Sequence, residues 1–394
     1  MLSRTAAGGC ARSDDWAGWP ETEEETLNTK RSLAVLLALG VATLGAACGA
    51  SSKTDSTDTG GNATPAASDT TATEAPATTA APAIKVGLAT DQGGLNDKGF
   101  NQLAAEGAKK AEAELGIELE IKESKTENDY VPNMTYFCQG GKQLVIAIGF
   151  LMANAVAEVA KQCPDTKFAI IDNSVQGDPI NAAPNVTGLL FKEQETGYLV
   201  GFLSGLINKE SGFKGVNGKN TISSVGGLEI PPVVRFIAGY QQGAKDANPD
   251  IKFLNAYSGE FVKTQPCKEL ALSQIEKGSD VVFQVAGNCG LGALEAAKEK
   301  GVWGIGVDKD QSFEGPHVLT SAVKRVDAAV FGAIKGAIDG SLAGGTDTVY
   351  GLAEDGVAIG TISPDVPQAI IDQVMAKAEE IKAGSVTIPT EVTK

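Results

Sequence analysis

Residues 100–111, FNQLAAEGAKKA, are matched by residues 236–247, FIAGYQQGAKDA. Each stretch begins with Phe and has Gly-Ala-Lys seven residues later, with Ala two residues further on. Each also follows a Gly-Gly pair. One such match could arise by chance, so the rest of the chain decides whether it marks a repeat.

Further landmarks follow in the same order in both copies. An apolar run ends in glycine, and a later run ends in aspartate; these residues are Gly149 and Asp172 in the first copy, and Gly287 and Asp308 in the second. The distance from the first Phe to the Asp is 72 residues in both copies. We interpret the chain as two similar α/β lobes. The alternative is that βα proteins in general share such spacings.

Short β-rich runs alternate with amphipathic helical patterns from Ile84 onward. Strands are expected over 84–90, 143–149, 167–172, 187–191, 220–225, 252–257, 280–286, 303–307, 317–321 and 357–361. Helices are expected over 99–115, 128–138, 152–162, 193–208, 232–247, 267–277, 291–300, 325–342 and 364–383. This alternation predicts parallel, doubly wound sheets.

The chain has 394 residues, of which 42% are hydrophobic, and its formal net charge is −16. This length allows two domains or one large two-lobed domain. The acidic excess argues against nucleic acid and against an anionic membrane surface as partners, although solubility alone also explains it. His317 is the only histidine, and its setting, EGPHVLTS, indicates the start of a strand rather than a catalytic or metal-binding site.

An export signal lies near the N-terminus. The stretch KRSLAVLLALGVATLGAAC has a basic pair, an apolar run and small residues before Cys48. The apolar run is too short to span a bilayer comfortably. LGAAC resembles a bacterial lipobox, in which the cysteine is lipidated and becomes the first residue of the mature protein, although Gly45 departs from the commonest form. An ordinary cleaved signal is the alternative.

The segments on either side of this signal differ in composition. Residues 1–26 include the acidic stretch ETEEET, which is unsuited to a signal peptide, so we expect the native start near Leu27. Residues 1–48 are therefore assigned to a non-native prefix plus a lipoprotein signal peptide. Residues 49–83 are rich in Ser, Thr, Ala, Pro and Gly, and we expect a disordered tether with a reach of roughly 30 Å.

Four cysteines follow the export signal: Cys138, Cys163, Cys267 and Cys289. An even number in an exported chain indicates disulfides. Of the three possible pairings, Cys138–Cys163 with Cys267–Cys289 is favoured, because each bridge closes a local loop within one half of the chain. Each would contribute roughly 3 kcal/mol in the loop-entropy model. No CxxC or other metal-ligand spacing occurs, and we expect neither a metal nor a cofactor.

A glycine-rich loop precedes the first copy of the repeat. The stretch GLATDQGGLNDKGFNQ (87–102) has the frame of a phosphate-binding loop, but Phe100 stands where the lysine belongs. The carboxylates of Asp91 and Asp97 would repel phosphate. Asn96 and Asp97 have the character of helix caps, which already occupy the helix N-terminus.

Ligands of open α/β sheets bind beyond the carboxyl ends of the strands. Five acidic or glycine residues fall at such ends: Asp91, Gly149, Asp172, Gly287 and Asp308. Carboxylates accept hydrogen bonds, phenylalanine faces suit a flat ring, and glycines allow close approach of the backbone. If the two lobes face each other across one cleft, the pattern predicts a neutral, hydroxyl-bearing aromatic ligand.

Four stretches occur in the order DQGGLNDKGFNQ, FKEQETGYLVGFLSG, GGLEIPPVVRFIAGYQQGAK and GIGVDKDQ. Together they resemble the basic membrane protein (Bmp/Med) family of solute-binding lipoproteins, which includes purine nucleoside receptors of ABC importers. The resemblance covers nearly all of 84–394. It implies an α/β type I periplasmic-binding-protein fold, with two doubly wound parallel-sheet lobes joined by a multi-strand hinge. Lobe 1 is expected over about 84–187 and 311–345, and lobe 2 over about 188–310 and 346–394.

The resemblance also implies residues that contact a nucleoside base. The first motif places Asp91, Phe100 and Asn101 at the ligand, with Phe100 stacked on one face of the base and Asn101 reading its edge. Asp172 is also placed toward the base, and Phe261 on its other face.

Three residues are implied near the sugar. Gly287 lies close to it, while Asp308 and Lys324 would hold ribose hydroxyls, and Lys324 would offset the repulsion between the carboxylates. Glu260 stands where the family's usual form has Ser, which could change selectivity. Asn288 with the following cysteine replaces a commoner Gly-Thr.

Several of these residues have structural alternatives. Phe100 and Phe236 both fit the cores of their helices; we assign Phe236 to the core and Phe100 to the ligand. Asp97 is assigned to a cap or turn. A solvated lysine at a helix start is the alternative for Lys324.

The implied mechanism is capture by hinge bending, in which ligand contacts from both lobes favour a closed state. ABC permease subunits would then recognise that state. The protein is expected to be an extracytoplasmic monomer, anchored to the cell membrane by its N-terminal lipid, and not an enzyme. The alternatives are a sensor or surface lipoprotein without transport, and a nucleoside hydrolase that uses the clustered aspartates. Such hydrolases usually need a metal or a histidine, and the spacing indicates neither.

Overall fold

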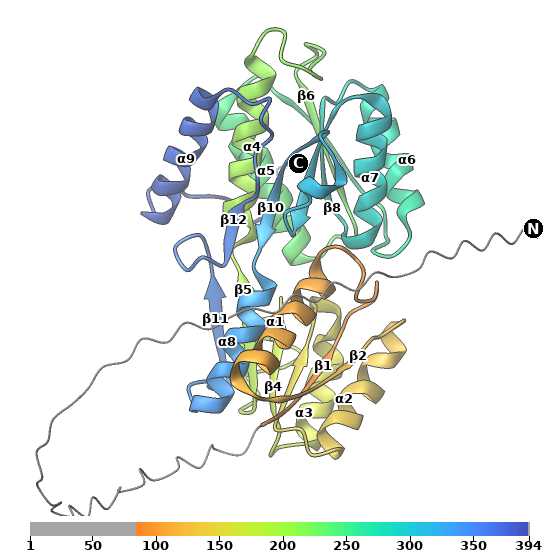
Figure 1. The fold of residues 1–394 in the computed structure, drawn as a ribbon, viewed down its shortest axis with the longest axis vertical. Coiled ribbons are helices and arrows are strands. Elements are labelled where there is room, and N and C mark those ends of the chain that lie inside the picture. The colour runs from red at the N-terminus through yellow and green to blue at the C-terminus, as the bar shows by residue number, and fades with distance from the viewer. Residues whose placement is uncertain (1–83, 393–394) are drawn as a thin grey trace, which may run out of the picture. The chain divides into compact units, whose positions relative to one another are not determined.

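Two six-stranded sheets form the framework of residues 84–392, which are the residues that the computed structural model describes (Figure 1). The first sheet consists, in spatial order, of β11 (Thr346–Tyr350), β5 (Val186–Phe191), β4 (Lys167–Ile171), β3 (Leu144–Ala147), β1 (Lys85–Ala89) and β2 (Glu118–Lys122). The expected signal peptide within 1–48, lipidation at Cys48 and the tether over 49–83 lie outside the described residues.

The second sheet repeats this order. It consists of β12 (Val357–Ile359), β10 (Val318–Lys324), β9 (Trp303–Asp308), β8 (Val281–Val285), β6 (Thr221–Gly226) and β7 (Lys252–Tyr257). Adjacent strands are parallel in both sheets except at one edge, where β12 is antiparallel to β10. The expectation of two similar, parallel-sheet α/β lobes is confirmed.

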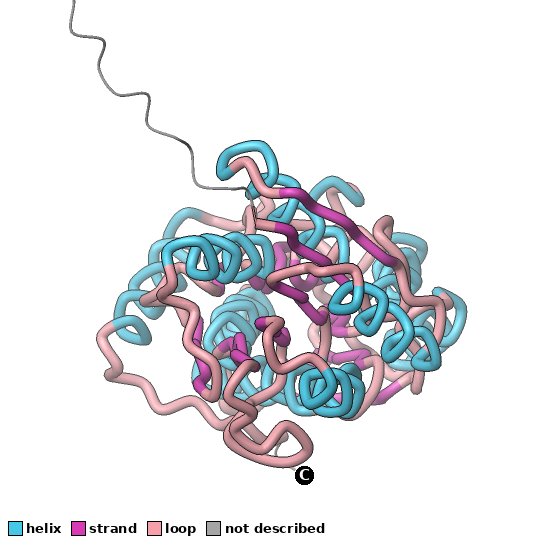
Figure 2. Tube along the Cα trace, turned by 90° about the horizontal axis from the view of Figure 1, so that it is seen from below, coloured by secondary structure: helices cyan, strands magenta, loops and turns pink. Residues whose placement is uncertain are grey.

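Nine α-helices of the described residues surround the strands (Figure 2). Lobe 1 comprises the first sheet with α1 (Phe100–Leu115), α2 (Tyr130–Gln139), α3 (Ala153–Gln162) and α8 (Val326–Asp339). Lobe 2 comprises the second sheet with α4 (Glu193–Lys209), α5 (Pro231–Ala247), α6 (Thr264–Glu276), α7 (Gly287–Lys300) and α9 (Gln368–Lys382). None of these helices is long and apolar enough to cross a bilayer.

Strand β3 shows why the inner strands read as continuous apolar runs. Leu144 and Ile146 belong to the buried cluster that includes α1, whereas Val145 and Ala147 belong to the cluster that includes α2 and α3. Successive side chains of a strand point to opposite faces, and here helices cover both faces. All four residues are therefore apolar, as expected for a parallel sheet buried on both sides.

The chain crosses between the lobes three times. The crossings follow β5, β10 and β11, so each strand belongs to the lobe that the chain is leaving. The expected boundaries were wrong on this point: β10 lies in the range 311–345 expected for lobe 1, yet it pairs with β9 in the second sheet. Conversely, β11 lies in the range expected for lobe 2 but pairs with β5. An apolar run in the sequence shows that a strand exists, but not which strand it will pair with.

Two strands have no counterpart among the ranges expected from sequence. β2 (ELEIK) and β11 (TDTVY) lie at the two edges of the first sheet. An edge strand pairs on one side only and leaves residues exposed to solvent, so it does not need a long apolar run. The remaining strands and all nine α-helices overlap their expected ranges.

The repeated Gly-Ala-Lys has the same structural reason in both lobes. Gly107 of α1 lies against the backbone carbonyl of Asp327 in α8, and Gly243 of α5 lies against that of Tyr198 in α4. A Cβ atom at either glycine would overlap the facing carbonyl oxygen. In each lobe the glycine therefore allows two neighbouring helices to approach closely.

The two disulfides join the cysteine pairs predicted from the sequence. Cys138 of α2 is bonded to Cys163, which follows α3, and Cys267 of α6 is bonded to Cys289 of α7. Each bridge therefore lies within one lobe and connects two helices that are consecutive in the chain.

Replacing Gly243 by alanine is expected to destabilise the protein by about 1–3 kcal/mol, because the added methyl group would force α4 and α5 apart. The matched control is Gly177→Ala, since a Cβ atom at Gly177 has no neighbour within 4 Å. Urea unfolding followed by circular dichroism measures both. Equal stability of the two variants would contradict close helix packing at Gly243.

Candidate functional site

A cavity lies between the two lobes at the carboxyl ends of both sheets. Its empty space, counted together with the solvent at its opening, is about 660 Å³. All eight residues implied by the resemblance line it: Asp91, Phe100, Asn101, Asp172, Phe261, Gly287, Asp308 and Lys324. The structure therefore brings the expected residues together, while their contacts with a ligand remain a proposal.

Equivalent residues of the two lobes form sharp turns at the strand ends beside the cavity. Asp172 follows β4 and has φ 71°, and Asp308 ends β9 with φ 63°. Gly149 and Gly287, at the ends of the neighbouring strands, also have positive φ values, of 119° and 53°. Aspartate is among the few residues with a side chain that adopt the left-handed region at modest cost. The sharp turn places each carboxylate beyond the strand end.

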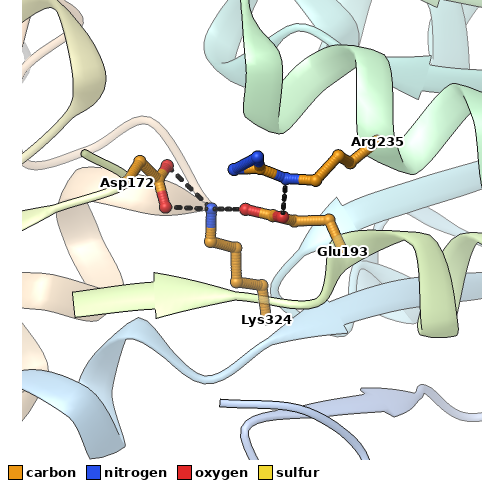
Figure 3. A network of polar contacts seen from close by, with 4 residues as sticks. All are labelled: Asp172, Glu193, Arg235 and Lys324. Carbon is orange, nitrogen blue, oxygen red and sulfur yellow. Dashed lines mark hydrogen bonds and ion pairs between the residues drawn. The ribbon is translucent and has the colours of Figure 1, made fainter. Parts of the chain in front are cut away.

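Four buried or partly buried charges form a continuous chain (Figure 3), and two of them, Asp172 and Lys324, line the cavity. The Nζ atom of Lys324 lies 2.6 and 2.7 Å from the two carboxylate oxygens of Asp172, and 3.0 Å from Glu193 Oε1. The Nε atom of Arg235 donates to Glu193 Oε2 at 2.8 Å. We call Asp172, Lys324, Glu193 and Arg235 the buried ion chain.

The buried ion chain lies where the chain crosses between the lobes. Lys324 is the last residue of β10 and Glu193 is the first residue of α4, so each adjoins a crossing. Asp172 comes from lobe 1, whereas Arg235 belongs to α5 of lobe 2. The ion pairs therefore link both lobes to the segments about which they would rotate.

The buried ion chain also bears on the role expected for Lys324. An ammonium group has three donors, and all three bonds given above are to carboxylates of the protein. Burial by itself would lower the pKa of Lys324, but the carboxylates of Asp172, Glu193 and Asp308 outweigh it and raise that pKa. Lys324 is 1% exposed and charged, so the alternative of a solvated lysine is wrong. A direct contact with a ligand hydroxyl would have to replace one of these bonds.

Asp308 differs from the other carboxylates of the cavity. No hydrogen bond among residues 84–392 reaches its carboxylate. Gly99 of lobe 1 lies opposite, and a Cβ atom added to this glycine would be 3.7 Å from Asp308 Oδ2. Burial raises the pKa of Asp308 to about 7; nearby Lys324 lowers it, and the carboxylates of Asp172 and Asp97 raise it further. Asp308 is therefore an acceptor without a partner in this part of the protein.

Asn101 holds the glycine-rich loop in shape. Its Oδ1 atom accepts from the Asp91 N–H at 3.1 Å, and its Nδ2 donates to the Gln92 carbonyl at 2.9 Å. The Tyr130 hydroxyl donates to the Asp91 carboxylate. Burial raises the pKa of Asp91 to about 6, although the Tyr130 hydrogen bond opposes this. The Asn101 amide thus positions Asp91, and its expected contact with a ligand edge would use its second amide hydrogen or the second lone pair of Oδ1.

Asp97 acts as the expected cap. Its carboxylate accepts the N–H groups of Gly99, Asn101 and Gln102 at 3.1, 2.8 and 3.1 Å. These are donors at the start of α1, which lack partners within the helix. The cap fixes the first turn of α1 and with it the Phe100 side chain.

Glu260 has a local role in lobe 2. Its Oε1 atom accepts the N–H groups of Phe261 and Val262 at 3.1 and 2.7 Å. The carboxylate that replaces the family's usual Ser is thus bonded to its own loop, and it does not line the cavity. This geometry does not support the expected effect of Glu260 on selectivity.

The rims of the lobes meet beside the cavity. Lys98 of lobe 1 pairs with Glu314 of lobe 2 at 2.7 Å, and Lys309 of lobe 2 pairs with Glu106 of lobe 1 at 2.7 Å. Gln311 also donates to the Lys98 carbonyl at 3.2 Å. Such partly exposed ion pairs are individually weak, so they link the rims of the lobes while adding little to stability.

A protein-family model described as "ABC transporter substrate-binding protein PnrA-like", the Bmp family, matches residues 84–391. The chain belongs to the Bmp family. The match spans both lobes and includes every residue that lines the cavity. The resemblance inferred from the sequence motifs is thereby confirmed.

This Bmp-family chain is similar in sequence to two named relatives and in structure to a solved protein. It is 32% identical to the ABC transporter nucleoside-binding protein BmpA of Lactococcus lactis, over 78% of this chain and 90% of that protein. It is 35% identical to an uncharacterized lipoprotein of Pyrococcus horikoshii, over 70% of this chain and 68% of that protein. A solute-binding protein of an ABC transporter system from Aeropyrum pernix matches with a TM-score of 0.70 and 26% identity, over 78% of this chain and 93% of that one. These likenesses confirm the expected type I solute-binding fold.

Sequence reasoning missed part of the Bmp site. Glu193 and Arg235 were not singled out, although both lie within stretches that carry the family resemblance. A single charge between apolar residues of a predicted helix is the signal that could have found Arg235; Glu193 lies in the polar stretch KEQET and gives no such signal. Phe236 was assigned to the core; it is 3% exposed and packs on Phe283, and it also lines the cavity. No group of three His, Cys, Asp or Glu residues suited to a metal occurs in 84–392.

Replacing Lys324 by methionine is expected to destabilise the protein by about 3–5 kcal/mol at neutral pH, because it leaves Asp172 and Glu193 buried without their shared cation. The matched control is Lys309→Met, which removes a partly exposed ion pair and should cost less than about 1 kcal/mol. Urea unfolding of both variants tests this. A loss in Lys324→Met no larger than in Lys309→Met would show that the buried ion chain is not a structural requirement.

Asp308→Asn is expected to make the protein more stable at pH 8. The folded state keeps the Asp308 proton up to about pH 7, whereas an ordinary carboxyl has a pKa of 3.8. The contribution of Asp308 to stability therefore falls as pH rises through this window. Asparagine also tolerates a positive φ. Thermal unfolding should show a difference from wild type that shrinks as pH falls toward 4; a difference independent of pH would contradict the raised pKa.

Proposed function

We propose that this Bmp-family protein is an extracytoplasmic, lipid-anchored receptor that captures a nucleoside, in particular a purine nucleoside, and delivers it to an ABC importer. The observation that carries the proposal is the pairing of aromatic rings and carboxylates in one cavity. Phe100 comes from lobe 1 and Phe261 from lobe 2, and Asp91, Asp172 and Asp308 lie between strand ends of the two lobes.

The chemistry of the cavity supports a flat, uncharged ligand that donates hydrogen bonds. Phenylalanine faces stack on a base, and the Asp308 carboxylate is an acceptor suited to ribose hydroxyls. Phosphate is disfavoured, because the lysine that could attract it is already bonded to Asp172 and Glu193. The name of the Lactococcus lactis relative, a nucleoside-binding protein, agrees with this assignment.

Capture would proceed by rotation of the lobes about the three crossings. A ligand between Phe100 and Phe261 contacts both lobes at once, so it favours the closed arrangement over any open one. The rim pairs Lys98–Glu314 and Lys309–Glu106 would form as the lobes meet. ABC permease subunits are the proposed partners of the closed monomer.

Membrane attachment would come from Cys48, within the signal pattern at 30–48. The Pyrococcus horikoshii relative is named a lipoprotein. Both disulfides of the described residues also suit an oxidising compartment outside the cytoplasm. Labelling of the expressed protein with a palmitate analogue should depend on Cys48; labelling that survives Cys48→Ser would contradict the anchor.

Removal of either cavity ring is expected to weaken binding. Isothermal titration calorimetry with inosine should show an affinity about 5- to 150-fold lower for Phe100→Ala and for Phe261→Ala, since one stack is worth about 1–3 kcal/mol. Asp308→Ala should also weaken binding. The matched control is Phe331→Ala in α8, a ring that does not line the cavity.

Inosine affinity that is unchanged in Phe100→Ala and Asp308→Ala would overturn the proposed site. Chromatography of the same inosine samples separates binding from catalysis, since released hypoxanthine would identify a hydrolase. Uptake of labelled inosine by cells that lack the protein separates transport from sensing: unchanged uptake would favour a sensor or surface lipoprotein.

A further inference from the structure

The two disulfides occupy equivalent helix pairs but opposite ends of them. Cys138 lies in the last turn of α2 and Cys163 follows α3, whereas Cys267 and Cys289 lie in the first turns of α6 and α7. Helices between parallel strands begin at the carboxyl ends of the strands, which is the cavity end of each lobe. The Cys267–Cys289 bridge is therefore near the cavity and the Cys138–Cys163 bridge is far from it.

The Cys267–Cys289 bridge flanks two residues that line the cavity. Phe261 precedes Cys267 by six residues, and Gly287 precedes Cys289 by two. The backbone N–H of Cys289 donates to the Phe261 carbonyl at 3.0 Å. The disulfide and this hydrogen bond together close a small ring of chain that holds Phe261 beside Gly287.

Further contacts join the Phe261 loop to the first turn of α7. Asn288 Nδ2 donates to the Val262 carbonyl at 2.6 Å, and the Ser258 hydroxyl lies 3.6 Å from Cys289 Sγ. The Phe261 ring lies over Gly227, where a Cβ atom would overlap it. The loop is thus fixed between the end of β6 and the start of α7.

Lobe 1 positions its aromatic ring in another way. Phe100 is the first residue of α1, and the Asp97 cap fixes that turn directly. Phe261 lies before α6, outside any helix or strand. Its loop leads into the first turn of α6 and is hydrogen-bonded to the first turn of α7. The disulfide bonds these two turns to each other, in addition to the close approach of Gly292 to the Thr264 carbonyl.

We propose that the Cys267–Cys289 disulfide is a positioning element of the ligand site, which holds the Phe261 ring in place before the ligand arrives. The inference rests on the proposed function for the class of ligand. A loop that is already ordered loses less conformational freedom on binding, so the bridge would increase affinity by preorganisation. The Cys138–Cys163 bridge, remote from the cavity, would contribute to stability alone.

The test compares two double variants, Cys267→Ala/Cys289→Ala and Cys138→Ala/Cys163→Ala, by calorimetry with inosine at a temperature where both are folded. Cys267→Ala/Cys289→Ala should bind inosine roughly tenfold more weakly than wild type, because a misplaced Phe261 ring loses part of the binding free energy of one ring–base stack. The second should bind like wild type, even if its melting temperature falls. In a Phe261→Ala background, loss of the Cys267–Cys289 bridge should change affinity by less than about twofold.

Hydrogen exchange gives a readout that needs no ligand. Loss of the Cys267–Cys289 bridge should speed exchange of the Cys289 amide and of the loop amides at Phe261 and Val262, while loss of the other bridge should not. If wild type binds no inosine, the proposed function fails and this comparison still decides the positioning role.

Three results would overturn the proposal. The first is equal affinity loss in the two double variants, and the second is unchanged exchange at Phe261 and Val262. The third is failure of both Cys267→Ala/Cys289→Ala and the volume-restoring Cys267→Val/Cys289→Ala to fold, which would make the bridge a requirement of the fold rather than of the ligand site.

Discussion

The structure depends on the burial of one ammonium group. Lys324 is almost wholly enclosed, and an unpaired charge in such a place is too costly to persist. Asp172 and Glu193 compensate it, and Arg235 in turn compensates Glu193. These groups come from both lobes and adjoin two of the crossings. The ion pairs that compensate Lys324 therefore hold together part of the cavity lining and two of the segments that join the lobes.

The remaining carboxylates of the cavity differ in how they are satisfied. Asp97 accepts three backbone N–H groups, and Asp91 accepts the Tyr130 hydroxyl. Only Asp308, of these three, is left without a hydrogen-bond donor in the described residues. The two lobes thus carry equivalent aspartates at equivalent turns in different surroundings: Asp172 is paired with the buried lysine, whereas Asp308 lines the cavity without a hydrogen-bond donor from the described residues.

The sequence predicted most of this arrangement because its signals are local. Inner strands are continuous apolar runs, and the strand-end rule brought Asp172 and Asp308 to one cavity. The edge strands β2 and β11 lack that signal and were missed, although the edge strands β7 and β12 were predicted. The residues of β10 do not show which strand it pairs with. The ion pair of Glu193 with Arg235 depends on the packing of α4 against α5, and the hydrogen bonds of Asn101 depend on the shape of a loop. Neither the ion pair nor these hydrogen bonds can be predicted from the order of residues alone.

The three crossings have a consequence for biosynthesis. The first sheet lacks its edge strand until Tyr350 has been made, and helix α8 joins lobe 1 only after nearly all of lobe 2. The second sheet in turn waits for β12 and then α9. A chain that is synthesised from its N-terminus therefore completes the two lobes almost simultaneously, near the end of translation. Neither lobe can be obtained whole as one uninterrupted fragment.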